Sequence, residues 1–199
     1  MWQRRQFIAG GLALTGLAAV PTRAISGTPG SDRGSRLATA QAALERHSGQ
    51  IVHGDLVGIA DFSLPSRLPR FFLVNLADGR ETSFLVSHGS GSDPGHSGWL
   101  ERFSNTPGSN ASSAGAYVTA SEYVGKHGRS MRLKGLEPSN SNAEQRAIVV
   151  HGAWYVSDAL ALERGKIGRS QGCFAFSEAD LGTILARLGP GRLLISDRL

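Results

Sequence analysis

Residues 147–152 read Ala-Ile-Val-Val-His-Gly, and residues 168–173 read Gly-Arg-Ser-Gln-Gly-Cys. The first stretch is a short run of apolar, mostly β-branched residues, which predicts a buried strand that ends at His151. The second is a polar turn with two glycines that leads directly to Cys173. A histidine at the end of a buried strand and a cysteine at the end of such a turn can meet across a cleft. These two stretches therefore guide the interpretation of the whole chain.

The rest of the sequence is rich in strand and turn signals. Gly accounts for 26 of the 199 residues, about twice its usual share of ~7%, which favours turns and hairpins over a helical bundle. Asp78-Gly79, between two apolar runs, predicts a two-residue hairpin turn. Strands are expected at residues 56–62, 71–77, 81–86, 117–124, 131–133, 147–150 and 193–196, with helices from Ser35 to near Gly49 and from Ser177 to Leu188. The predicted fold class is α+β, predominantly β, with a few helices.

A long segment, residues 88–114, interrupts this pattern. It is rich in Gly, Ser, Asn and Pro and has no hydrophobic periodicity. In a compact domain, a loop of this length is usually functional.

The first 24 residues have the features of an export signal. Arg4 and Arg5 precede an apolar run at residues 7–20, and Ala24 marks a small-residue cleavage site. The run is shorter than the ~20 apolar residues that span a membrane. Paired arginines before a weakly hydrophobic stretch resemble a twin-arginine signal, with an ordinary secretory signal as the alternative. We expect an exported protein of the periplasm or cell envelope, with no membrane anchor in its mature form.

The net charge argues against a nucleic-acid partner. The full chain has 21 Lys and Arg against 16 Asp and Glu, a formal charge of +5. Three of the positive residues, Arg4, Arg5 and Arg23, lie in the predicted signal, so 18 remain against 16 and the mature charge is +2. The remaining cations are scattered along the sequence, which indicates a mildly basic soluble surface.

Cys173 is the only cysteine of the chain, so no intramolecular disulfide can form. An unpaired cysteine in an exported protein calls for a chemical explanation, and a thiol redox protein would need a second cysteine. A thiol acts as a nucleophile when it is deprotonated, which a neighbouring imidazole and local N–H groups promote. The alternative is that Cys173 is a small buried hydrophobic residue and His151 a hydrogen-bonded histidine at a strand end.

Several stretches together resemble the murein L,D-transpeptidase catalytic domain family, of the YkuD type. That family has a His-Gly or His-Ser pair followed by Ser-His-Gly-Cys, and here His151-Gly152 and residues 170–173 match these positions. The similarity extends over residues 103–115, 123–128, 133–137 and 146–153 and covers roughly residues 51–197. We therefore expect a signal peptide at 1–24, a linker (25–36) and N-terminal helix within 25–50, and a catalytic domain at 51–199.

The resemblance implies a β-sandwich-type catalytic domain that acts on peptidoglycan stem peptides without a cofactor or metal. Cys173 would attack the bond between the third stem residue and a terminal D-alanine, and the acyl-enzyme would pass to an amine of a neighbouring stem, forming a 3→3 cross-link. His151 would be the general base, oriented by the carbonyl of Gly152. The N–H groups of Gly172 and Cys173 would stabilise the oxyanion. Substrate contacts are expected from Ser113, Arg169, Ser170 and Gln171.

The sequence departs from the family pattern beside the cysteine. Gln171 stands where the family has a second histidine, and Phe174-Ala175 replaces a frequent apolar-Arg pair. Two alternatives therefore stay open, an L,D-carboxypeptidase that hydrolyses the same acyl-enzyme and a catalytically weak cell-wall-binding protein. His88 and His127 are the alternative bases, and His88 with His96 would be the only candidate metal ligands, although no further His or Cys cluster supports a metal site.

Overall fold

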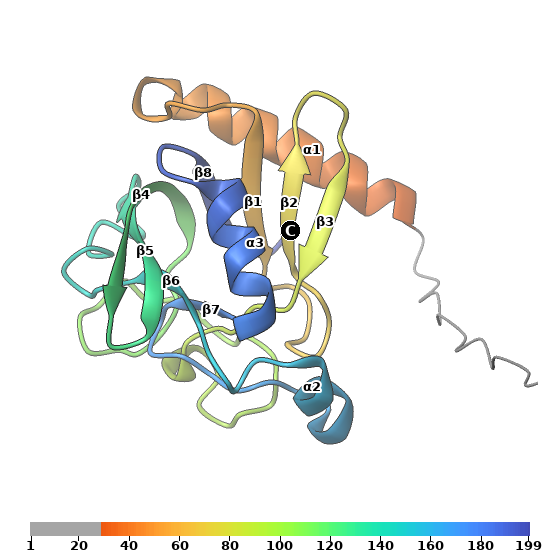
Figure 1. Cartoon of the computed structure of the whole chain (residues 1–199), viewed down its shortest axis with the longest axis vertical. Helices are drawn as coiled ribbons and strands as arrows, with labels where there is room; N and C mark the ends of the chain where they lie inside the picture. The colour runs from red at the N-terminus through yellow and green to blue at the C-terminus, as the bar shows by residue number, and fades with distance from the viewer. Residues whose placement is uncertain (1–28) are drawn as a thin grey trace, which may run out of the picture.

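The computed structural model describes residues 29–199, and eight strands of that segment form one mixed β-sheet (Figure 1). The order across the sheet is β3-β2-β1-β8-β4-β5-β6-β7. Neighbouring strands are antiparallel, except that β1 pairs with β8 and β6 pairs with β7 in parallel. The fold class α+β, predominantly β, is confirmed. The strands are β1 (Leu56–Asp61), β2 (Phe71–Asn75), β3 (Glu81–Phe84), β4 (Gly115–Gly125), β5 (Gly128–Gly135), β6 (Val149–Gly152), β7 (Phe174–Phe176) and β8 (Leu193–Asp197).

The sheet bends around a single main core, which gives the expected sandwich-type packing. Phe71 of β2 and Phe176 of β7 belong to strands near opposite ends of the sheet, yet their ring centroids lie 4.8 Å apart, edge to face. The helix α3 (Glu178–Leu188) adds Ile184, Leu185 and Leu188 to the same cluster. The two halves of the sheet therefore pack against each other, and the side chains between them form the main core.

The helix α1 (Pro29–Arg46) covers the opposite face of β1 and β2, so α1 and α3 lie on two sides of β1 (Figure 1). The expected linker over residues 25–36 is wrong from Pro29 onward, because the helix already begins there. Tertiary contacts explain this start: Arg33 Nε donates to the Gly79 carbonyl at 2.7 Å, and the Arg36 guanidinium binds the Glu81 carboxylate at 2.8 Å. The predicted signal, residues 1–24, lies outside the described residues.

The predicted hairpin around Asp78-Gly79 is present, but its connection is longer than the two residues expected. Val74 pairs with Glu81, and the Asn75 N–H donates to the Arg80 carbonyl at 2.9 Å, so the β2–β3 connection is the four-residue loop 76–79, which includes Asp78-Gly79. A two-residue turn instead joins β4 to β5, where Gly125 pairs with Gly128 and leaves Lys126 and His127 at the tip. This tip is important for the site described below.

Two further elements were not predicted from the sequence, β7 and the short helix α2 (Asp158–Arg164). The long loop at residues 88–114 is confirmed, with a single short 3-10 turn at Ser90–Ser92. Within residues 29–199, none of the helices has the length and apolar character needed to cross a membrane.

The aromatic contact between the two halves of the sheet should dominate the stability of the fold. Phe176 is fully buried, so Phe176→Ala is expected to lower the free energy of unfolding by about 3–5 kcal/mol through lost contacts and a residual cavity. Urea denaturation followed by circular dichroism measures this. Leu162→Ala is the matched control, because Leu162 is 86% exposed and should change stability by less than about 0.5 kcal/mol. Equal effects of the two substitutions would contradict this packing.

Candidate active site

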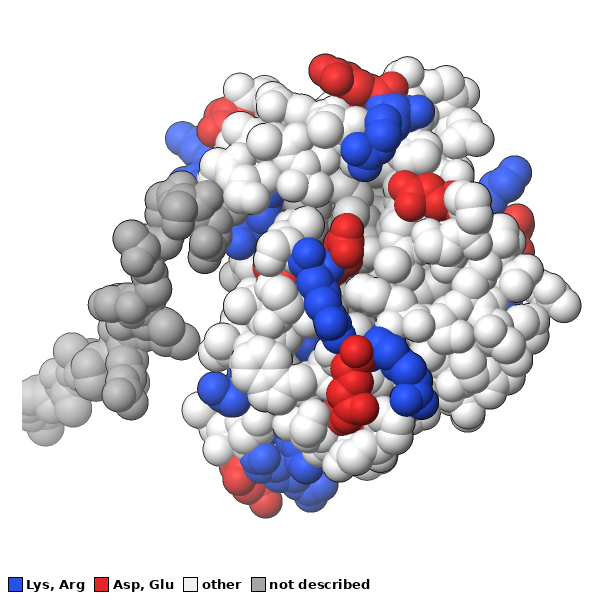
Figure 2. Space-filling model, turned by 180° about the vertical axis from the view of Figure 1, so that it is seen from behind, with Lys and Arg blue, Asp and Glu red and all other residues white. Residues whose placement is uncertain are grey.

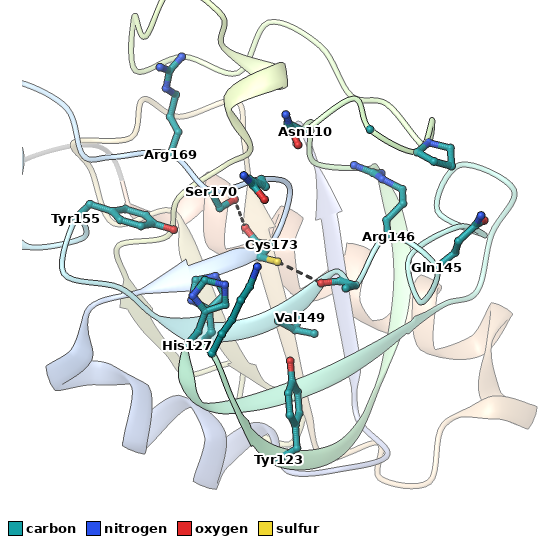
Figure 3. A pocket seen from close by; sticks show the side chains of 16 residues that line it. Asn110, Tyr123, His127, Gln145, Arg146, Val149, Tyr155, Arg169, Ser170 and Cys173 are labelled. Carbon is teal, nitrogen blue, oxygen red and sulfur yellow. Dashed lines mark hydrogen bonds between the residues drawn. The ribbon is translucent and has the colours of Figure 1, made fainter.

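The parallel pairing of β6 with β7 brings the two stretches around His151 and Cys173 side by side. His151 pairs with Ala175, and Cys173 directly precedes β7. Both residues line a cavity of about 490 Å³. Figure 3 shows Cys173 in this cavity, with Tyr155 on one side and Arg146 on the other.

His151 is held in one orientation from two directions. Its Nδ1 lies 2.8 Å from the Gly152 carbonyl oxygen, and because a carbonyl only accepts, Nδ1 carries a proton and Nε2 is the basic nitrogen. The ring of His127 stacks on it, with centroids 4.2 Å apart and planes at 18°. Burial lowers the pKa of His151, and the nearby His127 and Lys126 lower it further against the opposing effect of the Gly152 carbonyl. His151 therefore rests as the neutral imidazole at pH 7.

Cys173 rests as a neutral thiol. Its Sγ donates to the Ala147 carbonyl oxygen at 3.4 Å, so in this conformation the thiol is hydrogen-bonded to Ala147 and not to His151. Burial raises the pKa of the Cys173 thiol, and this outweighs a backbone hydrogen bond from Val149 and the charges of Lys126 and Arg146. Both shifts favour the uncharged groups at rest, so activation of Cys173 as a thiolate by its neighbours stays a prediction.

The turn before Cys173 is fixed by its own hydrogen bonds. Ser170 Oγ donates to the Cys173 carbonyl at 2.7 Å and accepts from the Gly172 N–H at 3.1 Å. In this conformation the Ser170 hydroxyl and the Gly172 N–H are bonded within the turn, and Ser170 also lines the cavity. Their expected contacts with the substrate and the oxyanion stay predictions. Gly172 has a φ of +115°, and a Cβ there would lie 2.7 Å from the Ala111 carbonyl oxygen, so only glycine fits.

A buried polar network of Arg70, His88 and Asp93 supports this turn. The Ser170 N–H donates to the His88 carbonyl at 2.9 Å, and the His88 ring contacts Arg70 through one nitrogen and Asp93 through the other. Arg70 Nη2 donates to His88 Nδ1 at 2.8 Å, and His88 Nε2 donates to Asp93 Oδ2 at 3.2 Å. Burial, followed by the charge of Arg70, lowers the pKa of His88 to about 4. His88 is therefore a neutral structural residue outside the cavity.

The other predicted site residues are distributed unevenly. Arg169 and Gln171 line the cavity, as expected for substrate contacts. Ser113 does not: it is buried away from the cavity, with its hydroxyl 2.6 Å from that of Tyr117. His96 Nε2 donates to the Ile167 carbonyl at 3.0 Å. Within the described part of the chain, no three His, Cys, Asp or Glu residues are grouped as metal ligands.

The cavity has a cationic lining, of which sequence analysis identified only Arg169. Lys126, Arg146 and Arg169 line it, and its lining includes no Asp or Glu. By contrast, Figure 2 shows a face of the molecule on which Lys and Arg alternate with Asp and Glu. Tyr155 was also missed, as was the stacking of His127 on His151. These residues lie in or beside the stretches that resemble the family, but only the hairpin geometry shows that they meet the cysteine.

Comparison with protein families decides the classification. A model of the L,D-transpeptidase catalytic domain matches residues 34–196. The chain belongs to this family. None of the curated proteins matches it significantly.

Solved L,D-transpeptidases include similar structures at low sequence identity. The L,D-transpeptidase from Mycobacterium smegmatis is 13% identical over 71% of this chain and 58% of its own, with a TM-score of 0.42. L,D-transpeptidase 3 from Mycobacterium tuberculosis is 17% identical over 71% of this chain and 60% of its own, with a TM-score of 0.44. The L,D-transpeptidase from Xylanimonas cellulosilytica is 17% identical over 78% of this chain and 68% of its own, with a TM-score of 0.39. The chain thus spans less than two thirds of the two mycobacterial proteins.

The protonation state of Cys173, the only thiol of this L,D-transpeptidase family member, can be measured through its alkylation rate. Because burial raises the pKa of Cys173, the thiolate should form only at high pH, and alkylation by iodoacetamide at pH 7 should be slower than that of free cysteine. The alkylation rate, followed by intact mass from pH 6 to 10.5, should have its midpoint above the ordinary cysteine value. The urea-unfolded chain supplies the reference titration. A rate that is already at its plateau near pH 7 would show a preformed thiolate.

Proposed function

We propose that the protein is an exported peptidoglycan L,D-transpeptidase with Cys173 as its nucleophile and His151 as its general base. The observation that supports this most is the β6–β7 pairing, which brings a histidine with an unprotonated Nε2 into one cavity with the only cysteine. A base that is oriented through its other ring nitrogen is the usual arrangement for activating such a nucleophile.

In the first half-reaction, the thiol turns from Ala147 toward His151 and attacks the carbonyl carbon that precedes the terminal D-alanine. Sγ forms a bond to that carbon while His151 Nε2 takes the thiol proton. The Cys173 N–H donates to the resulting oxyanion. His151 then gives the proton to the leaving nitrogen, the C–N bond breaks, and D-alanine departs. The acyl group of the donor remains bound to Cys173 as a thioester.

In the second half-reaction, an amine of a neighbouring stem attacks the thioester. His151 takes a proton from the amine and returns it to the departing sulfur, which restores the neutral thiol and completes a 3→3 cross-link. Because both groups rest uncharged, each proton transfer accompanies bond formation and no ion pair has to be built beforehand. This fits a site in which burial disfavours both charged forms.

Hydrolysis of the same thioester is the second candidate function. Cys173 is partly exposed, and Gln171 and His127 at the cavity rim are exposed, so water has access to the acyl group. The protein would then be an L,D-carboxypeptidase. The outcome depends on how well a bound acceptor excludes water.

Export rests on residues 1–24, which we propose to act as a twin-arginine-type signal. The mature protein would then work in the periplasm or cell envelope, where its peptidoglycan substrate is found.

Loss of the proposed base should slow acylation strongly. His151→Ala is expected to reduce the rate at which a carbapenem acylates Cys173 by about 10²–10⁴-fold, the range for a lost general base. Time-resolved intact mass measures this step without an acceptor. His53→Ala is the control, since His53 is exposed and does not line the cavity. Wild-type acylation by His151→Ala, with none by Cys173→Ala, would assign the base to another group, with His127 as the nearest.

Tetrapeptide muropeptides distinguish transfer from hydrolysis. Incubation with the mature protein should yield cross-linked dimers together with free D-alanine, as detected by mass spectrometry. Tripeptides without dimers would identify a carboxypeptidase and leave the role of Cys173 intact. Unchanged substrate, with a folded protein, would favour a wall-binding function.

A further inference from the structure

Lys126 is the one cation of the cavity that forms no hydrogen bond or ion pair within the described residues. Arg146 donates to the carbonyl oxygens of Ser104, at 2.7 Å, and of Ala111. Arg169 donates to two carbonyls in the loop before β4, those of Asp93 and Pro94. The two arginines therefore hold loops in place, whereas the Lys126 ammonium remains available to a ligand.

The position of Lys126 is set by the two-residue turn between β4 and β5. Gly125 pairs with Gly128, which fixes the tip, and Ser130 of β5 pairs with His151 of β6. His127, the other tip residue, stacks on the His151 ring. Lys126 lines the cavity beside it, and its charge influences both His151 and Cys173. A positive charge is thus held close to both groups of the proposed reaction.

We propose that Lys126 binds the C-terminal carboxylate of the acyl donor, that is, the carboxylate of the amino acid that leaves. This inference rests on the proposed function. In a peptide that ends one residue after the scissile bond, a single carbon separates the terminal carboxylate from the leaving nitrogen. A cation near both the nucleophile and the base is therefore close to that carboxylate, and the cavity has no acidic residue that competes for it.

The interaction selects acyl donors whose C-terminal carboxylate lies one residue after the scissile bond. A donor with one more residue after the scissile bond carries its carboxylate farther away, and an amidated donor has none. Lys126 exchanges no proton during the reaction: the thiol proton still passes through His151 to the leaving nitrogen. When the leaving amino acid departs with its carboxylate, the ammonium is released and an acceptor can enter.

The test compares two donors that differ only at the C-terminus, a tetrapeptide stem with a free D-alanine carboxylate and its D-alaninamide analogue. The mature protein, without the proposed signal at residues 1–24, is used. Release of D-alanine or D-alaninamide is followed by mass spectrometry. Wild type should prefer the free acid in kcat/KM by roughly tenfold to a hundredfold, as expected for a charge-assisted hydrogen bond. Lys126→Ala should lose this preference, so that the ratio of kcat/KM for the acid to kcat/KM for the amide falls to about 1, and Lys126→Arg should retain most of the preference.

Lys134→Ala is the matched control, because Lys134 is an exposed lysine of the same hairpin that does not line the cavity. It should keep the wild-type preference. A Lys126→Ala variant that slows both donors equally would overturn the proposal, since Lys126 would then act on the thiol or imidazole. A preference that survives in Lys126→Ala would also overturn it. If wild type releases neither product, the proposed function fails and this inference fails with it.

Discussion

The parallel pairing of β6 with β7 is the constraint on which the rest of the site depends. Side chains alternate between the faces of a strand, so the register fixes which residues enter the core. Phe174 and Phe176 are buried in the main core with Val150, while His151 pairs with Ala175 on the other face. A slip of one residue would turn His151 into the core. The aromatic packing of β7 therefore sets the position of the cysteine that precedes it.

The same burial that fixes the two residues also keeps them uncharged. Removing an imidazole or a thiol from water disfavours its charged form, so the pKa of His151 falls and the pKa of Cys173 rises. A resting ion pair is thus disfavoured from both sides. The positive charges at the cavity lower the pKa of Cys173, against the effect of burial. Lys126 also lowers the pKa of His151, in the same direction as burial. On the proposed mechanism, charge develops only when a substrate is in place.

The sequence predicts much of the fold because its signals are local. The apolar run before His151 and the Ser177 cap of α3 appear in the structure close to where they are expected. The start of α1 was missed because Arg36 stabilises it through Glu81, a contact 45 residues away. The helix α2 has both a Ser157 cap and a left-handed Gly165, but its seven residues give too short a pattern to detect.

The site was predictable only in part, for the same reason. Sequence identifies His151 and Cys173 as residue types with the right chemistry, and the family resemblance links them. The sequence alone cannot show that the Ser113 hydroxyl contacts Tyr117, or that the Ser170 hydroxyl bonds to the Cys173 carbonyl, because those contacts depend on packing. The stacking of His127 on His151 depends on a hairpin that folds over β6. Tertiary arrangement, not motif, determines these roles.

The protonation state of His151 tests the central physical claim most directly. Side-chain ¹⁵N correlation spectra of the mature protein, assigned with His151→Ala, report which ring nitrogen carries the proton. The hydrogen bond to Gly152 and the lowered pKa predict a neutral ring at pH 7, protonated at Nδ1 with a bare Nε2. An imidazolium at pH 7, or a ring protonated at Nε2, would contradict this account because neither could accept the thiol proton.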